Sequence, residues 1–382
     1  MGFLSGGIGY VVPFLVVLTV LVFVHELGHY LVARWNKVRI ETFSIGFGPE
    51  LFGWTDRVGT RWKVSAVPLG GYVKMFGDAD PTSMASPGEE LASMTDAEKA
   101  VSFHHKRLMQ RVAVVIAGPA ANFIFAIAVF AAIFATVGEA ITTPVVGQTQ
   151  PNSAAAASGF EAGDVIAQID GKRIATFEDI VTAVRLNVGA PMTIVIERNG
   201  QDKTLTVTPR VTRVTDRFGF EHRYPVLGIV GRPGARVRLN PLVAVEHAAQ
   251  QTGLMVSTNL AAVWQMIIGA RPADDVHGPL GIALLSGEVA KVGGILSLIG
   301  LMAALSVSLG LINLFPIPVL DGGHLLFYAA EALRGRPLGP RAQEYGFRVG
   351  LAVVLTLMVF ATWNDVVQIG PRVVAFFKGF TT

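Results

Sequence analysis

Three long stretches with almost no charged side chains constrain this 382-residue chain more than any other feature. They cover residues 8–32, where Glu26 is the one charged group, residues 112–137 and residues 292–320. Each is long enough to cross about 30 Å of hydrocarbon, which takes about 20 apolar residues in a helix. We therefore expect a polytopic membrane protein rather than a soluble protein with an enlarged core.

Composition agrees with this expectation and excludes several function classes. Charged residues make up 15% of the chain and the mean hydropathy is +0.51, whereas soluble proteins carry about 25% charged residues. The chain has no cysteine, which excludes a disulfide scaffold, a cysteine nucleophile and a thiolate zinc site. A net charge of +3 is too small to indicate nucleic acid, so no nucleic-acid partner is expected.

Two further apolar stretches are weaker candidates. Residues 347–369 are predicted to form a fourth span, with Asp365 near its end. Residues 248–270 are uncharged, but several Gln, Thr, Ser and Asn residues interrupt them, so we expect an amphipathic helix lying on a surface. A cleaved signal peptide is disfavoured because no Lys or Arg precedes the first apolar run and no small-residue cleavage site follows it.

Basic residues near the span ends predict the orientation in the membrane. They cluster after the first span, before the second, and between the third and the fourth. The members are Arg34, Lys37 and Arg39, then Lys106, Arg107 and Arg111, then Arg334, Arg336, Arg341 and Arg348. Four spans with both termini outside place all three clusters on one side. Residues 34–111 are then cytoplasmic, and residues 138–291 lie on the far side.

Residues 145–236 differ in character, because polar and charged side chains return there. Thr176, followed three residues later by an acidic side chain, predicts a capped helix. The Asn-Gly pair at 199–200, flanked by residues 192–197 and 203–208, predicts a β-hairpin. We expect a small strand-rich domain with one capped helix.

The end of the first span carries the letters H-E-L-G-H. On a helix, His25 and His29 share a face and can bind one metal ion, and Glu26 can act as a general base toward water. Ionisable groups inside a membrane segment are costly and usually mark function. The alternative is that the motif frays into the headgroup region near Arg34.

A catalytic zinc site normally takes three protein ligands, so a third one is required. Glu50 lies at a thermolysin-like distance downstream, but residues 44–49 break any second helix, which disfavours it. Asp321 is favoured, because the first and third of four alternating spans run in the same direction and both end toward the cytoplasmic half. His324 is a further alternative that we interpret as an interfacial histidine.

The approach to Asp321 contains two helix-breaking residues, Pro316 and Pro318. Broken helix at membrane depth is tolerated where it is buried in protein or lines a wet cavity. A hydrolase needs such a cavity, since water must reach the bond that it cleaves.

Two motifs, H-E-L-G-H and N-L-F-P-I-P-V-L-D-G, together resemble the site-2 protease family of intramembrane zinc metalloproteases, and within it the bacterial regulator of sigma-E protease type. The resemblance extends to V-P-L-G-G-Y-V-K-M at 67–75 and G-P-A-A-N-F at 118–123. It also extends to the insert, whose sequence is similar to that of a PDZ domain of bacterial proteases. It therefore covers most of the chain.

This resemblance implies roles for particular residues. Zinc is expected on His25, His29 and Asp321, with Glu26 as the catalytic base. Substrate handling is expected from Asn313, Pro316 and Pro318. A membrane-associated β-hairpin is expected at 61–75, bent at Gly70 and Gly71, where a strand edge near Val67 holds extended substrate.

The resemblance also implies a role for the insert. PDZ domains bind an extended peptide or a C-terminus by adding a strand to a sheet edge. A structural spacer without ligand is the alternative. The sigma-E type carries two PDZ domains, whereas this chain has room for one.

The expected architecture is an α-helical membrane core of about four spans with an inserted α+β PDZ domain. Its predicted parts are residues 1–137, 145–236, 240–290 and 291–382, namely the first half of the core, the periplasmic PDZ domain, an amphipathic surface segment and the second half of the core.

The expected function is a zinc metalloendopeptidase of the bacterial inner membrane that cleaves single-span proteins already trimmed outside, such as anti-sigma factors, or signal-peptide remnants. One alternative is a membrane-anchored PDZ adaptor with a vestigial metal site. A transporter is disfavoured, because the sequence shows no inverted repeat.

Overall fold

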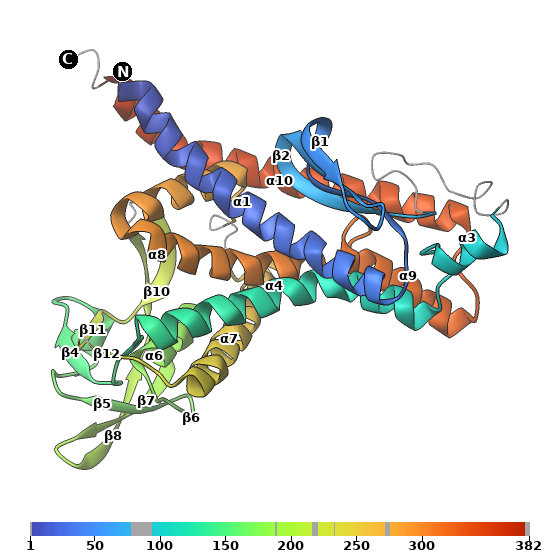
Figure 1. Cartoon of the computed structure of the whole chain (residues 1–382). Coiled ribbons are helices and arrows are strands. Elements are labelled where there is room, and N and C mark those ends of the chain that lie inside the picture. Colours follow the sequence, from blue (N-terminus) through green and yellow to red (C-terminus); the bar gives the residue numbers. More distant parts are fainter. Residues whose placement is uncertain are drawn as a thin grey trace. The chain divides into compact units, whose positions relative to one another are not determined.

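The computed structural model describes residues 2–77, 94–187, 189–215, 221–232, 234–271 and 276–378. The chain divides into two compact units, drawn together in Figure 1. The first comprises Met1–Val129 and His277–Thr382, and the second comprises Phe130–Val276.

The first unit is built on long apolar helices. They are α1 (Gly2–Trp35), α4 (Leu108–Thr136, which continues into the second unit), α8 (Pro279–Asn313) and α10 (Pro340–Lys378). Among the described residues, four helices are long and apolar enough to cross a membrane, and each lies in one of these elements. The prediction of a polytopic helical membrane protein is confirmed.

The start of the third span differs from the prediction. Helix α8 begins at Pro279, so it takes in Glu288 and Lys291, and its backbone departs from helical geometry at Gly294 (φ 66°). The hydroxyl of Tyr10 in α1 donates a hydrogen bond to Glu288, and Nζ of Lys291 lies 3.3 Å from the centre of the Tyr10 ring. Lys291, which marked the start of the span in the sequence, and Glu288 are thus accommodated by packing against α1.

The expected surface segment at 240–290 is correspondingly wrong in its second part. Its first part is helix α7 (Pro241–Ile267) of the second unit, which ends well before residue 290. The residues from Pro279 onward belong instead to α8.

The predicted helix break before Asp321 is confirmed. Helix α8 ends at Asn313, residues 314–320 are not helical, and α9 (Asp321–Arg334) begins at the aspartate itself. Val319 in this segment has φ 102°, a conformation that β-branched residues rarely adopt and that surrounding structure must hold.

A two-stranded antiparallel sheet, β1 (Ile40–Thr55) and β2 (Arg61–Met75), follows α1. Its turn lies at 56–60, where the Asp56 carboxylate accepts hydrogen bonds from the backbone N–H groups of Val58 and Thr60. The two glycines of the expected bend lie within β2, and the residues on either side of them, 62–64 and 71–73, run in opposite directions along residues 43–45 of β1.

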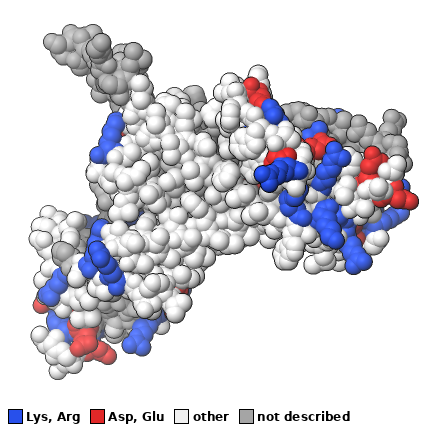
Figure 2. Space-filling model, viewed as in Figure 1, with Lys and Arg blue, Asp and Glu red and all other residues white. Residues whose placement is uncertain are grey.

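The two strands fold back on themselves. As a result, residues 43–45 of β1 lie between two segments of β2, residues 62–64 and 71–73. Phe43 pairs with both Val73 and Trp62 in the register of the sheet, and its ring stacks on Trp62 with centroids 4.3 Å apart. A short capped helix, α3 (Asp96–Val101), precedes α4. Figure 2 shows a broad uncharged face over the helices of the first unit and charged side chains gathered at the end where α3 lies.

The second unit is a small α+β domain built on a four-stranded sheet of order β6-β5-β7-β8, with three further strand pairs, β3–β12, β4–β11 and β9–β10. The strands are β3 (Glu139–Ile141), β4 (Val146–Thr149), β5 (Val165–Ile169), β6 (Lys172–Arg173), β7 (Met192–Arg198), β8 (Gln201–Val207), β9 (Arg210–Thr215), β10 (Glu221–Val226), β11 (Ile229–Gly231) and β12 (Ala235–Val237). Its shorter helices are α5 (Ala154–Ala157) and α6 (Phe177–Leu186).

Local signals in this unit are confirmed. Thr176 caps α6 in a capping box with Asp179. Asn199 (φ 56°) and Gly200 (φ 76°) form the tight turn between β7 and β8, where left-handed conformations are required. The core of the unit is apolar and includes Ile166, Ile180 and Ile194, all almost fully buried.

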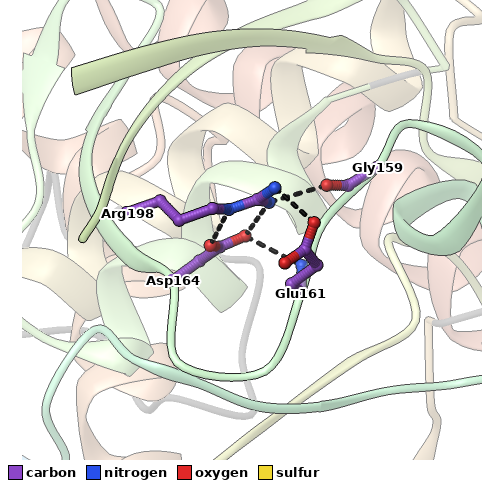
Figure 3. Close-up of polar contacts among 4 residues, drawn as sticks. All are labelled: Gly159, Glu161, Asp164 and Arg198. Carbon is purple, nitrogen blue, oxygen red and sulfur yellow. Dashed lines mark hydrogen bonds and ion pairs between the residues drawn. The ribbon is translucent and has the colours of Figure 1, made fainter. Parts of the chain in front are cut away.

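A compact ion-pair cluster closes the turn before β5 (Figure 3). The guanidinium of Arg198 in β7 donates to both oxygens of Asp164, at 2.7 and 2.8 Å, and also to Glu161 and to the carbonyl of Gly159. The backbone N–H of Glu161 donates to Asp164 as well. Both carboxylate oxygens of this buried aspartate thus accept hydrogen bonds.

Candidate metal centre

Two histidines on α1 form the first part of the site. His25 and His29 lie one helical turn apart, and their rings meet edge to face with centroids 4.8 Å apart. Both are 9% exposed. Their Nε2 atoms are 3.2 Å apart and point to a common position.

Asp321, the first residue of α9, completes the cluster. Its Oδ2 lies 3.2 Å from Nε2 of His25 and 3.5 Å from Nε2 of His29. Within the described part of the chain these three residues are the group whose ligand atoms could hold a metal ion, all within 4.8 Å of one another. A carboxylate in the first turn of a helix is also favoured by the helix dipole.

The donor set fits zinc. Oδ2 of Asp321 is buried and has no hydrogen-bond partner among the described residues, although buried carboxylate oxygens are normally satisfied. Two imidazole nitrogens and one carboxylate oxygen are ligands that zinc takes in catalytic sites, with a further position left for water. A cation between the three atoms would satisfy the unpartnered oxygen.

Two glycines allow α1 and α4 to approach closely at the cluster. A Cβ on Gly28 would lie 2.7 Å from the Cβ of Ala121 and would overlap the carbonyl of Ala117. A Cβ on Gly118 would overlap the His29 ring and lie 2.9 Å from Cε1 of His25. Any larger residue at either position would push the histidines away from α4.

Helix α4 also contacts the outer nitrogens of both rings. Nδ1 of His29 lies 2.8 Å from the backbone carbonyl of Val114, and Nδ1 of His25 lies 3.1 Å from the side-chain amide of Asn122. Sequence reasoning did not assign these residues. The available signal was a polar Asn within an uncharged span, in the G-P-A-A-N-F motif.

Glu26 faces the sheet rather than the third span. A Cβ on Gly71 of β2 would lie 3.3 Å from Cγ of Glu26, and the backbone of Val73 lies beside the Glu26 carboxylate. That carboxylate is also close enough to interact electrostatically with His25, His29 and Asp321. Strand β2 therefore lies directly beside the cluster.

An apolar cavity of about 230 Å³ opens between α1 and the sheet. It is lined by Phe23, Phe43, Ile45, Trp54, Trp62, Lys63 and Val64. Phe23 lies three residues before Glu26, so both side chains project from the same side of α1.

The alternative third ligands lie elsewhere. Glu50 in β1 forms an ion pair with Arg61 at 2.5 Å. The ring of His324 packs edge-on against Phe347 of α10. Neither belongs to the metal-type cluster.

The residues expected to handle substrate surround the non-helical segment and the sheet. Asn313 ends α8, Pro316 is exposed, and Pro318 is partly buried. Pro318 packs so closely on α10 that a Cβ on Gly350 would overlap its carbonyl. Val67 in β2 is 44% exposed and pairs with Phe47, while a Cβ on Gly70 would meet the Phe47 ring at 2.6 Å.

The family model of peptidase family M50 matches residues 13–357, a range that contains the whole cluster. The chain belongs to this family, the site-2 proteases. It is a zinc metalloprotease and a multi-pass membrane protein, as the sequence predicted.

Relatives match nearly the whole chain. A protein of Agrobacterium fabrum named "Putative zinc metalloprotease Atu1380" is 48% identical over 96% of this chain and 97% of its own length. Metalloprotease MmpA of Caulobacter vibrioides is 40% identical over 93% of this chain and 94% of its own length. Among solved structures, the PDZ domain of the SdrC-like protein of Listeria monocytogenes matches 24% of this chain and 88% of its own, with 19% identity and a TM-score of 0.19.

Proposed function

We propose that this metalloprotease cleaves transmembrane segments of single-span proteins, with His25, His29 and Asp321 as zinc ligands and Glu26 as general base. The observation that carries the proposal is the convergence of two imidazole nitrogens on a buried carboxylate oxygen that has no hydrogen-bond partner among the described residues. Helices α1 and α9 supply these atoms, so the proposed chemistry belongs to the apolar unit of the chain.

Bound zinc supplies a Lewis acid that activates water and polarises a peptide carbonyl. Glu26 accepts a proton from the attacking water and donates it to the leaving amine. The carboxylate is positioned for this by α1, since Glu26 follows His25 directly and precedes His29 by three residues, and strand β2 passes beside it at Gly71. The apolar surroundings exclude bulk water from the reacting groups.

The sheet provides a place for substrate. A helical substrate hides its peptide bonds, so the segment must be extended before cleavage. Strand β2 passes Glu26 at Gly71, where the missing side chain lets the strand pack closely on Glu26 of α1 and on the Ser44 carbonyl of β1. An extended segment adding to such a strand is held by main-chain hydrogen bonds, and the apolar cavity beside Phe23 can receive one of its side chains.

Basic clusters support the orientation with the metal centre toward the cytoplasm. The side-chain amide of Gln110 donates to Asn36, just after α1, and Arg111 forms an ion pair with Glu331 near the end of α9. These contacts bring the ends of α1, α4 and α9 that carry the basic residues to one end of the first unit. The positive-inside rule places this end in the cytoplasm.

The insert at 145–236 is then periplasmic. We infer that its PDZ domain binds a peptide or a new C-terminus, and that it admits single-span substrates, such as anti-sigma factors or signal-peptide remnants, only after they have been trimmed outside. The inner membrane of a bacterium is the proposed location, with the lipid bilayer around the four spans.

Cleavage of a reporter membrane helix by purified wild type and Glu26→Gln tests the proposal, with zinc measured in both. We expect Glu26→Gln to keep its zinc and to lose activity by about 10²–10⁴-fold, the usual contribution of a general base. Glu50→Gln is the matched control, since it removes a carboxylate outside the cluster, and it should behave as wild type. Equal cleavage by Glu26→Gln and wild type would exclude Glu26 as the base, whereas absence of both cleavage and zinc in wild type would favour a PDZ adaptor with a vestigial site.

A further inference from the structure

Asn122 is a buried polar residue in the middle of the uncharged helix α4, and the proposed reaction leaves it without a role. Its exposed fraction is 0%, and its side-chain amide lies 3.1 Å from Nδ1 of His25. The other amide atom, Oδ1, has no hydrogen-bond partner among the described residues. An amide held in this state costs free energy that an apolar residue of the same shape would not, so the fold alone does not account for it.

The two histidines are held by the same face of α4. Val114, Gly118 and Asn122 follow one another at intervals of four residues, so they form one row along the helix. Val114 contacts Nδ1 of His29, Gly118 makes room for both rings, and Asn122 contacts Nδ1 of His25. This row is built around the two imidazoles.

The chemistry at His29 shows what such a contact does. A backbone carbonyl can only accept a hydrogen bond. Nδ1 of His29 therefore carries a proton and donates a hydrogen bond to the carbonyl of Val114. Nε2 is then the unprotonated nitrogen and faces Asp321. A second group that fixes the tautomer of a ligand histidine in this way also fixes the orientation of the ring.

Ligation by His25 through Nε2 requires the same tautomer. Its Nδ1 must then donate, and the carboxamide of Asn122 must present its oxygen. A carboxamide rotated by 180° occupies the same space, so the side chain can present either atom to His25. With the oxygen toward Nδ1, the lone pair of His25 Nε2 points at the cluster, 3.2 Å from Oδ2 of Asp321.

We propose that Asn122 is a positioning residue of the metal centre: its carboxamide oxygen accepts a hydrogen bond from Nδ1–H of His25 and so holds Nε2 in the form that binds zinc. The inference rests on the proposed zinc ligands. It predicts that the hydrogen-bond acceptor at position 122, rather than the volume of the side chain, controls the zinc affinity.

Zinc affinity of the purified full-length protein, measured by competition with a chelator, tests this inference. Asn122→Leu keeps the branched shape and removes the acceptor, so we expect zinc binding to weaken by about 10–100-fold, the usual effect of losing such an outer partner. Asn122→Asp retains an acceptor and should restore most of the affinity. The melting temperature of metal-free Asn122→Leu should be at least as high as that of metal-free wild type, since the variant removes an unpartnered amide.

Ser306→Ala is the matched control. The Ser306 hydroxyl donates to the backbone carbonyl of Asn122 at 2.9 Å, so the variant disturbs the same place without touching the amide. It should bind zinc like wild type. His25→Ala reports on the metal site itself and should lose zinc.

The outcomes are distinguishable. If His25→Ala loses zinc while Asn122→Leu binds it like wild type, the role of Asn122 is refuted and the metal site stands. Equal losses in Asn122→Leu and Asn122→Asp also refute it, because the acceptor would not be what matters. If His25→Ala keeps its zinc, the proposed ligand set fails, and the inference fails with it.

Discussion

Two aspartates, one in each unit of the chain, have opposite surroundings. Asp164 in the insert accepts two hydrogen bonds from Arg198 and one from a backbone N–H. Asp321 in the helical unit has a buried oxygen without any hydrogen-bond partner among the described residues and two histidine nitrogens within 3.5 Å. The first carboxylate is satisfied by the chain, whereas the second is arranged around something that the chain does not supply.

The comparison separates a carboxylate that stabilises a fold from one that serves a site. Burying a charge is costly, and an ion pair with good geometry offsets that cost. Asp365 in α10 belongs with Asp164, because it accepts the N–H groups of Gly278 and Gly281 at the start of α8, at 3.1 and 2.8 Å. Helix α8 has no capping side chain of its own at Gly278, so Asp365 takes that part.

The largest effect is expected at Asp321. Asp321→Asn keeps the shape of the side chain but removes the anionic oxygen, so we expect loss of zinc and a fall in cleavage of at least about 10²–10⁴-fold. Metal content and reporter cleavage of the same preparation measure both effects. Full zinc content and full activity in Asp321→Asn would exclude Asp321 as the third ligand and leave Glu50 and His324 as the candidates.

Asp164→Ala should act in the opposite way. It leaves Arg198 without its buried partner, and we expect the insert to lose about 2–3 kcal/mol of stability, while zinc content stays that of wild type. Hydrogen exchange of the β5 and β7 amides in the full chain measures the loss. Glu161→Gln is the control: the Glu161 side chain is 66% exposed, so this change should have little effect. Loss of zinc in Asp164→Ala would contradict the separation of the two roles.

Asp365→Ala should cost less. The variant removes the acceptor of two N–H groups at the start of α8, and the expected loss is about 1–2 kcal/mol, the usual value for a helix cap. Faster hydrogen exchange near Gly281, with unchanged zinc content, is the expected measurement. Asp365→Asn keeps one acceptor oxygen and should fall between wild type and Asp365→Ala. Unchanged exchange in Asp365→Ala would show that the cap is dispensable.

The smallest effect is expected from pH. Burial by itself raises the pKa of Asp164, but the hydrogen bonds from Arg198 and from the Glu161 N–H outweigh it and hold the pKa below its ordinary value of 3.8. A carboxyl group whose pKa is lowered on folding contributes stability that is complete above its unfolded pKa and is lost as the pH falls through the folded one.

The insert of wild type should therefore lose this contribution only below pH 3.8. The difference in hydrogen exchange between wild type and Asp164→Asn should shrink as the pH is lowered through this range. A difference that stays constant there would mean that Asp164 does not titrate with a lowered pKa.

Features that depend on neighbours along the chain were readable in the sequence. His29 follows His25 by four positions, and helix geometry alone puts them on one face. Thr176 caps its helix and Asn199-Gly200 closes its hairpin, because both devices act over a few residues. The apolar spans and the break at Pro316 and Pro318 follow from composition and from the missing backbone donors in the same way.

Features that depend on segments far apart in the chain could not be predicted from the sequence. Strand β2 pairs with the preceding strand β1 through a turn at residues 56–60, so residues 61–75 belong to a larger sheet and do not form a hairpin of their own. The start of α8 was displaced because Tyr10, in another helix, contacts both Glu288 and Lys291. In each case a contact between residues far apart in the chain overrode a local signal.

The metal centre shows both kinds of determination. The sequence by itself determined the pair of histidines and the glutamate between them, since one helix carries all three. Tertiary structure decided which of the three candidate third ligands lies beside them. Helix α9 brings Asp321 to the histidines, whereas Glu50 pairs with Arg61 and His324 packs on Phe347. It also decided what lies behind the rings, because Gly118 and Asn122 of α4 reach them through helix packing that no local pattern encodes.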